Sequence, residues 1–147
     1  MKVRMVDVSP KPKVYREAIA SGKIVLKKKT IELVKSKKIE KGDVLSVATV
    51  AAILAAKKTS EIIPLCHPIP LTHVDVDFSI EDNFIEVKTK VRTTAKTGVE
   101  MEALAATMTA LLTIWDMVKK YEKDEKGQYP ETVITDVRVL AKIKGEK

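Results

Sequence analysis

Two runs of alternating apolar and polar residues, joined by a short polar turn, constrain the fold of this chain more than any other feature. Residues 72–80 carry valine, phenylalanine or isoleucine at every second position, with aspartate and serine between them. Residues 85–91 repeat the alternation after the turn Glu81-Asp82-Asn83. A period of two places the apolar side chains on one face of each strand. The sequence therefore predicts an antiparallel hairpin with one buried face.

A long helical pattern over residues 98–121 follows this hairpin. Lys119 falls within its apolar stripe, Asp116 lies at the edge, and Glu102 lies further round on the same side. Charged groups on a side that should be buried need a partner or a chemical task. An i,i+3 ion pair between Asp116 and Lys119 is the plainer explanation. At about 100° per residue, the stripe that we expect to be buried consists of Met101, Leu104, Ala105, Met108, Leu112 and Trp115.

A second helix is expected from Gly42-Asp43 to about residue 57. Between Val44 and Ala56 only Ser46 and Thr49 are polar. The apolar run is too short to span a membrane, and a helix that is apolar on nearly all sides needs cover on more than one side. In so small a protein, an interface between subunits would provide that cover, so we expect a homo-oligomer and no membrane partner.

The remaining patterns define one domain and a short arm. Residues 1–22 have little periodicity and are expected to form an extended arm that can be mobile. Residues 23–147 are expected to form a single catalytic α+β domain. Its further elements are a strand at 23–28, a short helix at 30–36, a polar link at 122–131 and a last strand at about 133–143. We predict an α+β fold, an antiparallel sheet with helices packed on one face, for which a ferredoxin-like arrangement fits.

Composition points to an anionic ligand and a reducing compartment. The 27 lysines and arginines outnumber the 20 acidic residues, giving a formal charge of +7. Such a balance attracts nucleic acid, an acidic membrane or a phosphorylated small molecule. Aromatic residues make up only 4% of the chain, which argues against a stacking platform for nucleic acid. The single cysteine, Cys66, and the lack of an apolar segment behind Met1 favour a cytoplasmic protein.

Three places carry side chains suited to chemistry. His67 lies in a stiff segment with three prolines, between residues 63 and 70, and can transfer protons or serve as a structural hydrogen-bonding group. A metal site at Cys66 and His67 is not expected, because His73 is the single further histidine and Cys66 is the single cysteine. Lys41 precedes a glycine and a helix start, where an anion can bind. Glu100 fits a capping box that begins at Thr97, whereas Glu102 has no such structural explanation.

Five motifs follow one another along the chain: Met5-Val6-Asp7-Val8-Ser9, Lys41-Gly42-Asp43-Val44, Ile63-Pro64-Leu65-Cys66-His67-Pro68, Lys96-Thr97-Gly98-Val99-Glu100-Met101-Glu102-Ala103-Leu104 and Asp116-Met117-Val118-Lys119. In this order they resemble the MoaC family, the cyclic pyranopterin monophosphate synthases of molybdenum cofactor biosynthesis. The resemblance implies a ferredoxin-like subunit, a hexamer built as a trimer of dimers, and active sites at dimer interfaces.

The resemblance also implies roles for individual residues. Asp116 matches the family's acid/base aspartate, Lys119 matches its lysine partner, and Lys41 matches a lysine that the reaction needs. Arg16 looks like a phosphate-binding arginine carried by the arm. The residues implied to contact substrate are Leu65, Cys66, His67, Met101 and Glu102, with Glu100 beside them. We expect each site to combine two chains, with Lys41 and Asp116 among the shared parts.

The implied substrate is 3′,8-cyclo-7,8-dihydroguanosine 5′-triphosphate, which becomes cyclic pyranopterin monophosphate and diphosphate. The reaction needs groups that move protons and cations that hold phosphates, and this chain offers both. No cofactor is required by the sequence, although magnesium can accompany the substrate phosphates. The main competing interpretation is a non-enzymatic basic nucleic-acid-binding module, and a further one is a structural assembly subunit, in which Asp116 and Lys119 would be dispensable.

Overall fold

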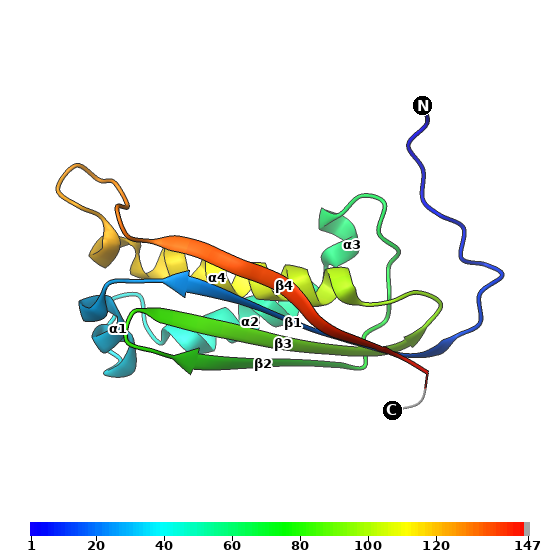
Figure 1. The fold of residues 1–147 in the computed structure, drawn as a ribbon, viewed down its shortest axis with the longest axis horizontal. Coiled ribbons are helices and arrows are strands. Elements are labelled where there is room, and N and C mark those ends of the chain that lie inside the picture. The colour runs from blue at the N-terminus through cyan, green and yellow to red at the C-terminus, as the bar shows by residue number, and fades with distance from the viewer. Residues whose placement is uncertain (146–147) are drawn as a thin grey trace.

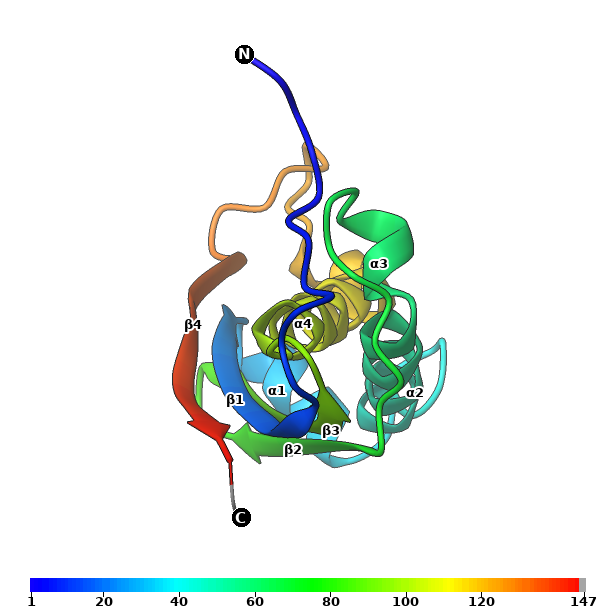
Figure 2. The same ribbon diagram turned by 90° about the vertical axis from the view of Figure 1, so that its right-hand side faces the viewer.

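A four-stranded antiparallel sheet with helices on one face forms the body of the protein (Figures 1 and 2). The computed structural model describes residues 1–145, and the last two residues of the expected domain lie outside it. The strands lie in the order β2-β3-β1-β4, the ferredoxin-like arrangement, so the α+β prediction is confirmed. The elements are β1 (Val14–Val25), α1 (Lys28–Lys35), α2 (Val44–Lys57), α3 (Thr59–Ile62), β2 (His73–Ile80), β3 (Phe84–Ala95), α4 (Glu100–Glu122) and β4 (Val133–Lys144).

The predicted hairpin is β2 and β3, and its register follows the alternation in the sequence. Val74 pairs with Val91, and Ile80 pairs with Ile85 across the turn. Ile85, Val87 and Val91 are fully buried, as expected for the face that α2 and α4 cover. The apolar alternation alone was therefore enough to set this part of the fold.

The expected boundary between arm and domain is wrong. β1 begins at Val14, pairs with β3 on one side and β4 on the other, and so residues 14–22 belong to the centre of the sheet. The inward side chains of β1 include Ala18 and Ala20, which are too small to give a clear apolar alternation. At position 22 there is room only for glycine, because a Cβ there would lie 2.8 Å from Leu111 Cδ1 of α4. Because close helix–sheet packing requires small residues, this strand shows no clear apolar alternation in the sequence. The arm therefore consists of residues 1–13.

The face of α4 that packs on the sheet also differs from the prediction. The expected stripe turns outward: Met101, Met108 and Leu112 are 42%, 54% and 63% exposed. The small residues of β1 bring α4 close, and alanines on the helix fit that short distance. The buried apolar face instead consists of Ala103, Ala106, Ala110, Leu111, Ile114, Met117 and Val118. Lys119 is therefore half-buried at the edge of the core and not inside it.

α2 packs along α4 and leaves an apolar face outward. Ala48 and Ala52 are buried against the core, whereas Val47, Val50 and Leu54 are exposed. α4 is long and apolar enough to cross a membrane, but half of the residues in that stretch are buried inside the domain. The core position of α4 accounts for its apolar composition.

A buried carboxylate fixes the C-terminal end of α4. Glu122 is fully buried, and one of its oxygens accepts hydrogen bonds from the Lys27 amide at 3.1 Å and from the Thr30 hydroxyl at 2.5 Å. The other oxygen accepts one from the Thr132 hydroxyl at 2.6 Å. Glu122 thus ties α4 to the start of α1 and to the segment that leads into β4.

Candidate active site

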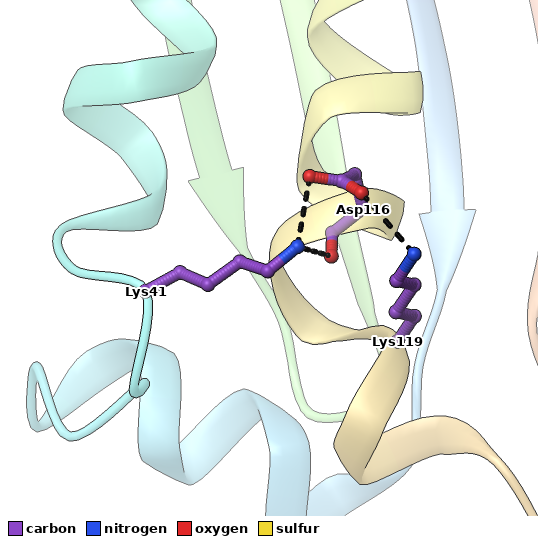
Figure 3. Close-up of polar contacts among 3 residues, drawn as sticks. All are labelled: Lys41, Asp116 and Lys119. Atoms are coloured by element: carbon purple, nitrogen blue, oxygen red, sulfur yellow. Dashed lines mark hydrogen bonds and ion pairs between the residues drawn. The ribbon is translucent and has the colours of Figure 1, made fainter.

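An aspartate held between two lysines stands on the last turns of α4 (Figure 3). Lys41 Nζ lies 3.0 Å from Asp116 Oδ2 and donates to the Asp116 backbone carbonyl at the same distance. Lys119 Nζ lies 3.6 Å from Asp116 Oδ1. All three side chains are about half exposed, between 45% and 59%. The cluster is therefore built before any ligand arrives and remains open to one.

The two lysines keep the carboxylate charged. The hydrogen bond from Lys41 is the main cause that lowers the pKa of Asp116, followed by the charge of Lys41 and that of Lys119. An ionised carboxylate can accept a proton, and the two ammonium groups give the cluster a net positive charge that suits a phosphate. The arrangement can therefore combine proton transfer with binding of an anion.

A turn before α2 delivers Lys41 to Asp116. Gly42 has a φ of +120°, a conformation that L side chains rarely adopt, and its amide donates to the Ile39 carbonyl at 3.1 Å. Ile39 is buried in the core and anchors the turn. The glycine noted in the sequence thus allows the chain to reverse and to aim Lys41 at α4. Asp43 takes the N-cap position of α2 and accepts a hydrogen bond from the Ser46 hydroxyl.

A second group of predicted residues gathers at the opposite end of α4. A cavity of about 610 Å³ lies there between the N-terminal arm, the proline segment and the start of the helix. Its lining includes Leu65, Cys66, His67, Glu100 and Met101. Five of the seven residues predicted to bind substrate therefore meet at one cavity.

Glu102 is a buried acid beside this cavity. Its side chain is 2% exposed, and within residues 1–145 its Oε1 atom has no hydrogen-bond partner. The Cys66 thiol lies 3.8 Å from Oε2 as a weak donor. Burial raises the pKa of Glu102, and burial together with the neighbouring Glu102 raises the pKa of the Cys66 thiol. A carboxyl with a raised pKa can hold a proton and donate it, the opposite of the state that Asp116 adopts.

The N-terminal arm lies over the proline segment. His67 Nε2 lies 2.7 Å from the Val6 carbonyl oxygen, a distance that fits a hydrogen bond from a protonated ring nitrogen. Lys96 Nζ donates to the Ser9 carbonyl at 3.2 Å. These contacts connect three of the motifs, 5–9, 63–68 and 96–104, which are distant in sequence. The motif 96–104 includes Lys96, but sequence reasoning gave this residue no role, because a contact to a backbone carbonyl of a remote segment leaves no local pattern.

Arg16 and Glu100 occupy surroundings that differ from the expectation. Arg16 lies on β1 and not on the arm; it is 6% exposed and donates from Nη2 to the Lys96 carbonyl at 3.2 Å. Glu100 forms an ion pair with Lys142 at 3.6 Å. The prediction of a capping box at Thr97 and Glu100 is wrong. Val99 is the N-cap of α4, and within the described chain no side chain caps this helix. Thr97 lies too far before the first helical residue to serve as the cap.

The two groups of residues are separated along α4. Asp116 and Glu102 lie 14 positions apart in the helix, about 21 Å at 1.5 Å per residue. Lys41, Asp116 and Lys119 come together within one chain, so the expected sharing of Lys41 and Asp116 between two chains is wrong. A ligand that touched both groups of one chain would have to span that distance.

The fold and these two groups define an α+β protein with acid–base groups arranged for an anionic ligand. The chain belongs to the MoaC family, whose model matches residues 5–145. It is 60% identical to proteins from Sulfurisphaera tokodaii and Pyrococcus furiosus, covering 97% and 99% of this chain and 95% and 93% of those proteins. Both carry the description "Probable cyclic pyranopterin monophosphate synthase". A protein from Methanothermobacter thermautotrophicus, 59% identical over 98% of this chain and 91% of its own length, carries the description "Probable cyclic pyranopterin monophosphate synthase accessory protein".

Proposed function

We propose that this protein converts 3′,8-cyclo-7,8-dihydroguanosine 5′-triphosphate to cyclic pyranopterin monophosphate and diphosphate, a step of molybdenum cofactor biosynthesis. The observation that carries the proposal is the Lys41–Asp116–Lys119 cluster, together with the similarity to relatives described as synthases of that product. A half-exposed carboxylate between two ammonium groups is the chemistry that a triphosphate substrate with mobile protons requires.

The proposed mechanism divides the work between the two ends of α4. Closing the cyclic phosphate requires a substrate hydroxyl to attack the α-phosphorus; its proton passes to a base, and diphosphate leaves with the electron pair of the broken P–O bond. Asp116 is ionised and serves as a proton acceptor, while Lys41 and Lys119 neutralise the charge that grows on the departing diphosphate. Glu102, with its raised pKa, is the candidate proton donor during the ring rearrangement.

A complete site in this proposal needs two chains. The outward apolar side chains of α2 and α4, Val47, Val50, Leu54, Met108 and Leu112, form a surface that a second copy would cover. A hexamer built as a trimer of dimers accommodates such pairing, with the Asp116 cluster of one chain facing the Glu102 end of another. Light scattering at micromolar concentration tests the assembly, and a stable folded monomer would contradict it.

Magnesium, if the reaction uses it, belongs to the substrate in this proposal. In the described part of the chain, residues 1–145, no three His, Cys, Asp or Glu side chains group in a way that would hold a metal ion. The ion would therefore enter bound to the triphosphate oxygens, and no step above depends on it.

The free Cys66 thiol suits the reducing cytoplasm, where we place the protein.

The direct test is to incubate the purified protein with the cyclised triphosphate and to measure diphosphate and the cyclic phosphate product. Release of both in equal amounts is the expected result. Tight, strongly salt-dependent binding to nucleic acid without product would instead favour the nucleic-acid-binding alternative.

A further inference from the structure

The turn that carries Lys41 is held against α4 by residues that the mechanism above does not use. The backbone amide of Glu40 donates a hydrogen bond to the Tyr121 hydroxyl at 2.9 Å. The Glu40 carboxylate also forms an ion pair with Lys120. Glu40 is the residue immediately before Lys41, and Lys120 and Tyr121 immediately follow Lys119. We call Glu40, Lys120 and Tyr121 the turn clamp.

The clamp and the catalytic cluster share one turn of α4. Asp116 and Lys120 are four residues apart and therefore lie on the same side of the helix. The turn thus meets α4 at two neighbouring points: Lys41 reaches Asp116, and Glu40 reaches Lys120 and Tyr121. Lys41 has a long, flexible side chain with many rotamers, and it loses that freedom when it is held in one position. Fixing its backbone one residue away lowers the freedom that must be lost when Nζ meets Asp116.

The clamp also determines which acid pairs with which lysine. Two acids, Glu40 and Asp116, and three lysines, Lys41, Lys119 and Lys120, lie along this short stretch. Lys120 engages Glu40, which keeps that second carboxylate from competing with Asp116 for Lys41. A free Glu40 would also add negative charge next to a site that has to receive a triphosphate.

We propose that Tyr121 and Glu40 are positioning residues that hold Lys41 on Asp116 and so keep the carboxylate ready for proton transfer. The inference rests on the proposed function for its kinetic consequence, but the positioning itself is a property of the protein without substrate. It adds two residues to the site that lie outside the family motifs in this sequence.

The test is the substitution Tyr121→Phe, which removes the accepting hydroxyl and keeps the ring. Asp116 is followed by the ¹³C chemical shift of its carboxyl during a pH titration without substrate. The charged groups that face it are Lys41 and Lys119, and looser contact with Lys41 should move its titration toward higher pH. With substrate, kcat should fall by roughly threefold to tenfold, the range of one net hydrogen bond. Lys41→Ala sets the upper limit of both effects.

Matched controls separate positioning from general damage. Tyr129→Phe alters another tyrosine near the end of α4, one whose ring packs edge-on against Trp115, and should leave the Asp116 titration unchanged. Glu40→Gln keeps the backbone amide but breaks the ion pair with Lys120, and should shift the titration less than Tyr121→Phe.

An unchanged Asp116 titration in a folded Tyr121→Phe protein overturns the inference, whatever happens to turnover. If the titration shifts but the wild-type protein forms no product, the positioning stands and the proposed function fails. If kcat falls while the titration stays in place, Tyr121 acts by another route and is not a positioning residue.

Discussion

The two ends of α4 carry acids that the protein treats in opposite ways. At the C-terminal end, Asp116 is open to solvent, contacted by two lysines, and has a lowered pKa. At the N-terminal end, Glu102 is buried, and its pKa is raised. One helix thus carries one carboxyl with a lowered pKa and one with a raised pKa, about 21 Å apart along its axis. Both groups are carboxyls with similar ordinary pKa values, so the difference between them comes from their surroundings: burial for Glu102 and contact with two lysines for Asp116.

The largest expected effect comes from removing the acceptor. Asp116→Asn should reduce product formation by about 10²-fold to 10⁴-fold, the usual contribution of a general acid or base. The side chain is 59% exposed, so folding and assembly should not change. Diphosphate release measures the activity, and Asp82→Asn in the β2–β3 turn is the control. Near-normal turnover of Asp116→Asn would show that the cluster is only a surface ion pair without a catalytic role.

Subunit mixing sharpens the comparison by asking whether the two ends act together across chains. Inactive Asp116→Asn chains co-refolded with inactive Glu102→Gln chains should recover part of the activity, because some mixed sites contain both intact groups. The control is Asp116→Asn mixed with Lys41→Ala, which should recover nothing, since those residues meet within one chain. Recovery in the control, or none in the first mixture although hetero-oligomers form, would contradict this pairing.

The pH dependence of stability should reveal the buried acid. Because the folded-state pKa of Glu102 is raised above 4.5, the folded protein binds more protons than the unfolded chain between the two pKa values. The contribution of Glu102 is therefore fully present below about pH 4.5 and is lost as the pH rises through the folded-state pKa. Relative to Glu102→Gln, the wild-type protein should lose Tm as the pH rises from about 4.5 through the folded-state pKa of Glu102. Parallel Tm curves would show that Glu102 is not protonated by burial.

The smallest effect is expected for Glu100, which lies near Glu102 but is paired at the surface. Glu100→Gln breaks the ion pair with Lys142 and should change the free energy of unfolding by at most about 1 kcal/mol. Thermal melts at low and high salt check this value. A much larger loss would mean that Glu100 supports the N-terminal end of α4 in a way that its ion pair does not explain.

Local sequence patterns predicted most helices and strands of this fold, but they misplaced the start of β1 and the buried face of α4. Apolar alternation predicted the β2–β3 hairpin, a nearly unbroken apolar run predicted α2, and helical periodicity predicted the extent of α4 but not its buried face. The five motifs identified the family. β1 was shortened in the prediction because Ala18, Ala20 and Gly22 pack closely without giving an apolar signal. The same small residues explain why the alanines of α4, and not Met108 or Leu112, face the sheet.

The candidate site was predictable as a set of residues but not as an arrangement. The motifs supplied Lys41, Asp116 and Lys119, and the structure brings them together. The division of the predicted residues between two ends of a helix depends on tertiary contacts, as do the clamp of Tyr121 on Glu40 and the burial of Arg16. Such contacts join residues about 80 positions apart, where one sequence carries no pattern.

The strand order has a consequence for how the chain is made. β1 is made before the other elements of this fold, yet its partners are β3 and β4, and β4 follows all the other elements in chain order. The central strand must therefore wait, without its second neighbour, until nearly the whole chain has emerged. Three consecutive inward positions of β1 are small, Ala18, Ala20 and Gly22, and Ile24 is the large apolar residue that follows them on the same face. We therefore expect the small residues that let α4 approach the sheet closely in the finished protein also to leave the waiting strand less prone to aggregate than a strand of large apolar residues would be.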